Sequence, residues 1–378
     1  MKPEFINGPT NFAYLKGNIN GIEKNIYLFF DKHLDLENQT RCKSFNSIDI
    51  SYYLYRLIQE SKVPLDFFME IELSQLNSDI SDKKDIYIKE VINLFKSEFA
   101  LKNNKNLDIE YSKTNSNVRL HYFDIRDHLD IYYLTKIINQ KIIKYYGELK
   151  KEYNIKYIDK ISYYLDLISS KLDIFNKNTK EVIDNKSVKY DKFNDKQKYY
   201  LNKIINQYEN KDLRNYINFF ISSHSGIIIN SINGVIELIK NMFKSIIPLN
   251  LNILKNKIDE LGEYILRLYF FYTDAYLLRR ILDKNYVKNC IIYSGGYHSV
   301  NYIFFLVKHC NFRIINIYNS QEKNTNELMK KIINESYSFN LSELFLLKKV
   351  YIQCIHLIPL GIDDLFSSEL KKYFQSKI

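Results

Sequence analysis

Apolar, strand-like runs in four places of the chain end at side chains that can bind a metal ion or move a proton. In chain order these groups are Asp31 and His33; Glu70 and Glu72; Asp124, Arg126, Asp127 and His128; and the Gly295–Gly296 turn with His298. In open α/β sheets, ligands bind at the carboxyl ends of the strands. The sequence therefore predicts one site that is assembled from distant segments.

Imidazole and carboxylate groups at these strand ends suit a divalent metal ion. We expect Asp31, His33, Glu70 and His298 to be its ligands, because this mixture of groups favours Mn, Fe or Zn. Such an ion lowers the pKa of a bound water and so supplies a hydroxide nucleophile near neutral pH. The predicted cofactor is thus a divalent metal ion.

The remaining polar groups have expected catalytic roles. Glu70 or Glu72 would act as a metal ligand or as the general base. Arg126 would clamp an anionic group of the substrate or hold the carboxylates in a bidentate pair. Asp124 lies two residues from Arg126, so both side chains would share one face of an extended strand. A single His at a strand end is more often a surface or capping residue, and the agreement of four strand ends is what favours a site.

Composition indicates a folded chain with a large core. The chain has 378 residues, of which 46% are hydrophobic and 15% aromatic. Disordered chains lack aromatic and β-branched residues, so disorder is not expected. This length suits two or three domains, or one domain with a large insertion.

Net charge and cysteine usage limit the partners and the compartment. A net charge of +10 favours phosphates or acidic surfaces. No dense basic block appears, however, so we expect scattered surface lysines, and nucleic-acid binding is a third alternative. The four cysteines show no CxxC spacing, which predicts reduced thiols in a cytosol-like compartment. No apolar signal region and no run of about 18 apolar residues appear, so neither a secretory signal nor a membrane span is expected.

Hydrophobic periodicity predicts an α/β fold with a mainly parallel sheet flanked by helices and with a large helical insertion. The expected parts are an N-terminal half (1–130), the helical insertion (131–285) and a C-terminal half (286–378). In the first part, a strand at 22–31, a helix at 48–61 and a strand from 65 form a β-α-β pattern. That pattern implies a parallel pair of strands. His121, in the middle of a later strand, is expected to be packed.

Several segments together resemble a family pattern. They are "IYLFFDKHLDLENQTRC", "PLDFFMEIEL", "HYFDIRD", "DAYLLRRIL" and "NCIIYSGGYHSVNYIFFL". They resemble uncharacterised proteins of large cytoplasmic DNA viruses. More distantly, the pattern resembles the erythromycin-esterase-like and TraB/Tiki-type hydrolases. Those hydrolases place Gly-x-x-His at the first strand end, Glu at the second, and another Gly-x-x-His late in the chain.

The resemblance implies a metal-dependent, hydrolase-like protein that acts on a small molecule or a peptide. The family's site positions fall on His33, on Glu70 or Glu72, and on His298. At the first motif Phe30 stands in the place of the glycine. The alternative is therefore a catalytically inactive viral structural or interaction protein that keeps the fold and makes virion or self-association contacts. Either protein would be found in the host cytoplasm or the virion.

Overall fold

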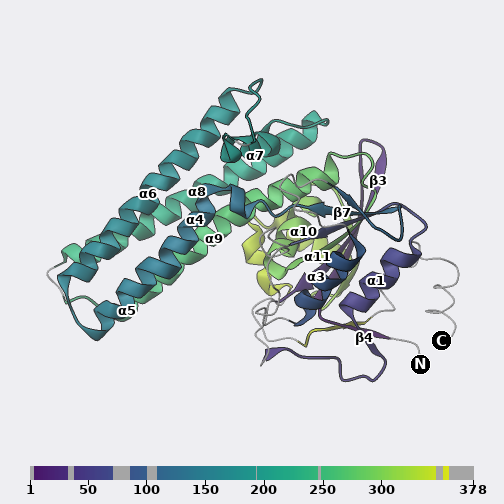
Figure 1. The fold of residues 1–378 in the computed structure, drawn as a ribbon, viewed down its shortest axis with the longest axis horizontal. Helices are drawn as coiled ribbons and strands as arrows, with labels where there is room; N and C mark the ends of the chain where they lie inside the picture. Colours follow the sequence, from purple (N-terminus) through teal and green to yellow (C-terminus); the bar gives the residue numbers. More distant parts are fainter. Residues whose placement is uncertain are drawn as a thin grey trace. The chain divides into compact units, whose positions relative to one another are not determined.

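The chain folds into two compact units. The computed structural model describes residues 4–32, 38–70, 86–99, 109–192, 194–245, 248–345 and 352–356. One unit comprises 1–124 with 280–378, and the other comprises 125–279. The first unit is α/β and the second is helical (Figure 1). The helical insertion that is predicted from the sequence comprises 131–285.

A mixed sheet of seven strands forms the centre of the first unit. Across the sheet the order is β6 (Glu110–Tyr111), β7 (Val118–Tyr122), β5 (Leu65–Met69), β8 (Asn289–Gly295), β3 (Ile22–Asp31), β2 (Asn11–Ile19) and β9 (Arg313–Tyr318). The inner strands β7, β5, β8 and β3 run parallel, whereas β6, β2 and β9 pair antiparallel. The fold is α/β as predicted, but a mainly parallel sheet is not confirmed.

A tight hairpin explains one antiparallel edge. β2 and β3 pair along all of β2, and Asn20 and Gly21 connect them with φ angles of 54° and 80°. Two consecutive residues with positive φ match a type I′ turn, for which Asn-Gly is the preferred pair. No strand is predicted for 11–19, although this dipeptide is a strong hairpin signal.

The predicted β-α-β neighbours are not neighbours in the sheet. β8 lies between β3 and β5 and pairs in parallel with both. The interior of β8, from Cys290 to Ser294, is buried, as expected for a central strand that is covered on both faces. A C-terminal strand therefore completes a sheet that the first 130 residues only begin.

Helices cover both faces of this sheet. On one face α1 (Ile50–Glu60) packs beside α3 (Ile86–Glu98), and the ring of Tyr53 lies 6.1 Å from that of Phe29 in β3. The next residue of β3, Phe30, points to the opposite face because side chains alternate along a strand.

The opposite face is covered by α10 (Gly296–Cys310) and the short helix η5 (Ser338–Glu343). The ring of Phe345, just after η5, lies 5.9 Å from that of Phe30. Farther along the chain from α10, α11 (Thr325–Asn334) follows β9. A second, three-stranded sheet joins β10 (Cys354–His356), β1 (Phe5–Asn7) and β4 (Ser47–Asp49).

The second unit consists of helices with side-chain N-caps at several starts. Its elements are η3 (Arg126–His128), α4 (Asp130–Ile137), the π-helical η4 (Ile138–Ile142), α5 (Ile143–Lys151), α6 (Ile155–Asp184), α7 (Lys196–Ile205), α8 (Lys211–Lys244) and α9 (Leu251–Leu282), whose end reaches the first unit. Asn154, Asp195 and Asn210 accept hydrogen bonds from the first turns of α6, α7 and α8. Such caps satisfy donors that the helix itself leaves unpaired.

Among the described helices, α8 is long and apolar enough to cross a membrane by length and composition alone. Its most apolar 18-residue window has a mean hydropathy of 1.3, and 44% of that window is buried within the protein. The core helix of a soluble protein passes the same test. The absence of a membrane span therefore stays a prediction.

Candidate functional site

The carboxyl ends of the parallel strands lie along one edge of the seven-stranded sheet, which we call the rim. Asp31 at the end of β3 is in register with Gly295 at the end of β8. Met69 of β5 is in register with Tyr293 of β8 and with Tyr122 of β7. Glu70, one residue beyond β5, therefore lies at the same edge as the end of β8.

Glu70 and His298 come together at the rim. The backbone N–H of Gly295 donates a hydrogen bond to Glu70 Oε2 at 2.8 Å. Glu70 Oε1 lies 3.3 Å from His298 Nε2, and the two side chains are only 9% and 3% exposed. The carboxylate is thus held between a backbone amide and an imidazole in a nearly dry environment.

The junction between β8 and α10 explains this geometry. α10 begins at Gly296, so His298 lies in its first turn and Glu70 faces the start of the helix. The partial positive charge of a helix N-terminus favours a carboxylate there. Ser294 and Ser299, both buried, hydrogen-bond to each other at 3.0 Å and tie the strand end to the helix.

Asp31 lies at the rim but belongs to the other face of the sheet. It is 2% exposed and two residues from Phe29, so it shares the face that α1 covers. Glu70 instead reaches His298 at the start of α10. Among the described residues, no group of three or more His, Cys, Asp or Glu side chains is arranged to hold a metal ion.

The other predicted site residues lie in several parts of the chain. Asp124 is buried and follows β7 at the rim. Arg126 belongs to the second unit, where its guanidinium carbon lies 6.0 Å from the ring centre of Tyr269. His33 and Glu72 lie outside the described residues. The catalytic and metal-binding roles of all these residues stay predictions.

His128 also lies in the second unit. Its ring stacks on Tyr200 with the centres 4.5 Å apart. Burial, with smaller contributions from Lys196 and Lys192, lowers the pKa of His128 to about 4.

A buried charged network that the sequence analysis does not predict crosses β5 and β7. Asp66, with 0% exposure, accepts hydrogen bonds from Arg119 Nε at 2.7 Å and from Arg119 Nη2 at 2.8 Å. His121 Nε2 lies 2.6 Å from Asp66 Oδ1, and Arg280 Nη2 lies 3.1 Å from His121 Nδ1. The sequence contains a signal for this network, because a carboxylate inside an apolar strand, such as Asp66, needs a paired cation.

The network fixes the tautomer of His121. A guanidinium can only donate, so Nδ1 of His121 accepts from Arg280, and Nε2 carries the proton that it donates to Asp66. Burial is the main reason that the pKa of His121 falls to about 4. The hydrogen bond to Asp66 opposes this shift, and the nearby Arg280 and Arg119 add to it. The imidazole is therefore neutral at physiological pH.

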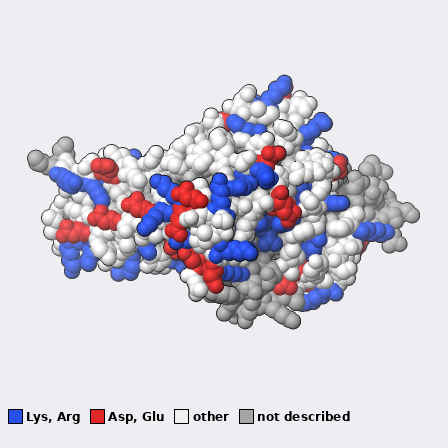
Figure 2. All heavy atoms as spheres, turned by 90° about the horizontal axis from the view of Figure 1, so that it is seen from above, with Lys and Arg blue, Asp and Glu red and all other residues white. Residues whose placement is uncertain are grey.

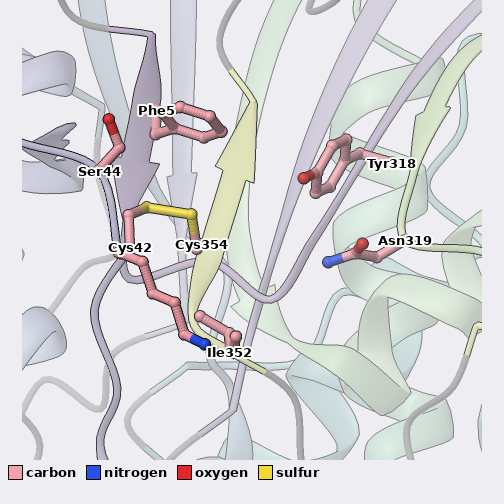
Figure 3. Close-up of a pocket in the computed structure, with 8 residues that line it drawn as sticks. Phe5, Cys42, Ser44, Tyr318, Asn319, Ile352 and Cys354 are labelled. Atoms are coloured by element: carbon pink, nitrogen blue, oxygen red, sulfur yellow. A yellow bond between two sulfur atoms is a disulfide. The ribbon is translucent and has the colours of Figure 1, made fainter. Parts of the chain in front are cut away.

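A cavity of about 600 Å³ opens beside the small sheet. Its lining consists of Phe5, Cys42, Lys43, Ser44, Tyr318, Asn319, Ile352 and Cys354, and so includes neither Glu70 nor His298. Figure 3 shows the rings of Phe5 and Tyr318 on different sides of it, with the bonded sulfur atoms of Cys42 and Cys354 nearby.

The disulfide between Cys42 and Cys354 corrects the prediction of reduced thiols. The pairing of β1 with β10 places Cys354 in register with Asn7, and the Asn7 side chain accepts a hydrogen bond from the backbone N–H of Cys42. The two cysteines are 312 residues apart, so their spacing carries no information about this contact. Cys290 and Cys310 remain free thiols.

We expect two of the four cysteines to react with a maleimide when the protein is denatured without a reductant. Cys42 and Cys354 are bonded, whereas unfolding exposes Cys290 and Cys310. Intact mass spectrometry should show two added labels before reduction and four after it. Four labels before reduction would contradict the disulfide.

Lys and Arg side chains do not gather into one basic patch on the face shown in Figure 2. They alternate there with Asp and Glu side chains. This distribution on the visible face agrees with lysines scattered over solvated surfaces, as the absence of a basic block in the sequence predicts.

Comparison with known proteins supports the predicted relation to large DNA viruses. The chain is 28% identical to the uncharacterized protein R706 of Acanthamoeba polyphaga mimivirus over 395 residues, covering 90% of this chain and 93% of that protein. It is 29% identical to the uncharacterized protein R161 of the same virus over 417 residues, covering 92% and 95%. No solved structure matches the chain.

These matches give no support to the more distant resemblance to esterases and TraB/Tiki-type proteins, which stays a prediction. The family of unknown function DUF5847 matches residues 4–253 and 244–360, which together span most of the sequence. The chain therefore belongs to this family.

Proposed function

We propose that the rim carries a hydrolase-like site in which Glu70 and His298 form an acid–base pair. The supporting observation is the buried Glu70 carboxylate, which accepts the N–H of Gly295 and lies 3.3 Å from His298 Nε2. A carboxylate in this position orients an imidazole, so that the other ring nitrogen, Nδ1, takes a proton from the attacking water. The distant resemblance to the erythromycin-esterase-like and TraB/Tiki-type hydrolases agrees with this role.

The predicted Mn, Fe or Zn ion does not enter this proposal. Among the described residues, Glu70 and His298 are two potential ligands side by side, whereas catalytic zinc sites use three protein ligands. We therefore derive the proton transfer from the two side chains alone. The proposed substrate is a small molecule or a peptide with a hydrolysable bond.

One observation favours the alternative of an inactive viral structural or interaction protein. Phe30 replaces the glycine of the first hydrolase motif, and its ring is fully buried against Phe345. A core aromatic residue at this position removes the close backbone approach that a glycine allows.

We expect His298→Ala and Glu70→Gln each to lower kcat/KM about a hundredfold, because general acid–base groups typically contribute that much. The assay would use the full chain and a panel of chromogenic esters and amides. His309→Asn, in the last turn of the same helix, is the matched control and should keep full activity. No turnover of any substrate in the panel, or equal rates in all variants, would favour the structural alternative.

Elemental analysis of the same preparations tests the predicted metal. If the wild type contains stoichiometric Mn, Fe or Zn and His298→Ala loses it, the metal ion is part of the proposed site. Wild-type protein that hydrolyses a substrate while free of metal would support the acid–base pair alone.

A further inference from the structure

The disulfide between Cys42 and Cys354 lies beside the cavity next to the small sheet (Figure 3). Both cysteines are half-buried and line this cavity of about 600 Å³, whereas the free thiol of Cys290 is fully buried in the central strand β8. Cavities of this size hold small organic molecules. A small thiol in the cavity would therefore lie next to the disulfide without any opening of the large sheet.

Positive charge lies close to one end of this bond. Among the described residues that line the cavity, Lys43 is the only Lys, Arg, Asp or Glu, and its side chain is exposed. Arg41, on the other side of Cys42 in the sequence, is 63% exposed and lies 3.8 Å from its partner Asp49. Cations next to a cysteine stabilise its thiolate and attract anionic thiols. Cys42 is therefore the better leaving group of the two cysteines.

These charges determine the order of the exchange steps. The thiolate of an anionic thiol attacks Sγ of Cys354, the sulfur–sulfur bond breaks, and the electron pair leaves on Sγ of Cys42. A second thiolate then attacks the reagent's sulfur in the mixed disulfide and releases the thiolate of Cys354. Two reagent thiols are thereby oxidised to one disulfide, and the two cysteines take up the two electrons and the two protons.

The bond joins the same two segments that the hydrogen bonds of Gln353 join. Gln353, with 0% exposure, donates from its backbone N–H to Oγ1 of Thr40 at 2.7 Å, and its Oε1 accepts the N–H of Thr40 at 3.1 Å. Its carbonyl oxygen accepts the N–H of Gly8 at 3.0 Å. Each cysteine of the disulfide lies within two residues of Thr40 or Gln353. The amides of Gly8 and Thr40 therefore report whether β10 is in place.

β10 is a short strand at the edge of its sheet. It has three residues and, among the described strands, pairs with β1 on one side. Short peripheral strands open at low free energy. A cross-link between residues that are 312 positions apart stabilises such a contact because it restricts the separated state. Breaking the bond therefore weakens the attachment of β10 to β1.

We propose that the cavity admits a small anionic thiol, which reduces the Cys42–Cys354 bond in the folded protein and so releases β10 from β1. The small sheet is then a redox-sensitive switch, which is closed while the bond is intact and opens in a reducing environment. The reductant comes from outside the chain, and the inference does not depend on the acid–base pair at the rim.

Trapping of the new thiols tests whether the folded protein is reduced. The full chain is incubated with mercaptoethanesulfonate, quenched with iodoacetamide and digested for mass spectrometry. Cys42 and Cys354 should be alkylated while Cys290 stays unmodified, because Cys290 is fully buried in β8. The rate should rise in proportion to the concentration of the thiol, as expected for direct attack on the bond.

Lys43→Gln tests the role of the cavity. The variant should slow reduction by mercaptoethanesulfonate about fivefold more than reduction by mercaptoethanol, because the sulfonate adds one negative charge to the attacking thiolate. Lys62→Gln is the matched control, since Lys62 is an exposed lysine of the same unit that does not line the cavity. It should slow both reactions equally little.

Hydrogen exchange tests the release of β10. In Cys354→Ser the amides of Gly8 and Thr40 should exchange about a hundredfold faster than in the wild type, the effect of a typical cross-link. The amide of Asn25, which donates to the carbonyl of Lys288 in the large sheet, should keep its protection and so shows that the variant is folded. Cys310→Ser removes a free thiol and should leave all three amides unchanged.

Three outcomes would overturn the inference. Alkylation of Cys42 and Cys354 only together with Cys290 would show that reduction requires unfolding, and the bond would then be purely structural. An equal effect of Lys43→Gln on both thiols would remove the cavity from the reaction. Equal exchange of the Gly8 and Thr40 amides in the wild type and in Cys354→Ser would show that β10 stays bound without the disulfide.

Discussion

Asp66→Asn should lower the free energy of unfolding of the α/β unit by about 3–5 kcal/mol, the usual cost of removing one partner from a buried ion pair. Asp66 is fully buried and receives two hydrogen bonds from Arg119 and one from His121. The neutral amide keeps the shape of the side chain but removes the negative charge. Its NH₂ group would also face a donor, which costs further hydrogen-bond energy.

Hydrogen exchange of the backbone amides of β5 (Leu65–Met69) is the appropriate measurement. It reports the opening of this strand separately from the helical unit, whose unfolding need not be concerted with it. Glu23→Gln is the matched control, because the Lys16–Glu23 pair is exposed by 42% and 57%. Loss of such a surface pair costs about 1 kcal/mol or less. Similar protection in both variants would show that the Asp66 network does not stabilise the sheet.

The rim was predictable because strand ends are local signals. Apolar runs that stop at Asp31, at Glu70 and at the Gly295–Gly296 turn mark the carboxyl ends of strands, and parallel strands bring these ends to one edge. The Glu70–His298 contact follows from that rule, although 228 positions separate the two residues (298 − 70). The rule does not say which face of the sheet each side chain takes. Asp31 and Glu70 differ in this respect, and His33 lies outside the described residues, so the predicted ligand set stays a prediction.

The sequence does not predict contacts that depend on strand register or on the pairing of distant segments. Asp66 meets Arg119 because β5 and β7 pair in one particular register, and a shift by one residue would move Arg119 to the other face. Cys42 meets Cys354 because β10 pairs with β1. The β2–β3 hairpin, which makes the sheet mixed, differs from these contacts because the adjacent residues Asn20 and Gly21 predict its turn. The antiparallel edge could therefore be predicted from this local signal.

Acidification from pH 6.5 to pH 4 should destabilise the α/β unit by about 3 kcal/mol through His121. The pKa of His121 is about 4 in the folded protein and near 6.5 in the unfolded chain. Between these values the unfolded chain binds a proton that the folded state does not, so the free energy of unfolding falls as the pH falls. The contribution is complete below about pH 4 and absent above about pH 6.5. The size follows from about 1.4 kcal/mol for each pKa unit.

His121→Gln separates this effect from the rest of the acid response. The glutamine amide can donate to Asp66 and accept from Arg280, as the neutral imidazole does, but it does not titrate. Exchange of the β5 amides in this variant should therefore lose the extra 3 kcal/mol of pH dependence that the wild type shows, by the same linkage.

His128→Gln distinguishes an acid destabilisation that is local to the surroundings of His121 from one that involves the whole chain. The pKa of His128 is also lowered to about 4, but this residue lies in the helical unit, where it stacks on Tyr200. Its substitution should flatten the acid response of the amides of α7 and leave that of β5 as in the wild type. If His128→Gln changed β5 as strongly as His121→Gln does, the acid response would belong to the whole chain. The neutral imidazole between Asp66 and Arg280 would then not be its origin.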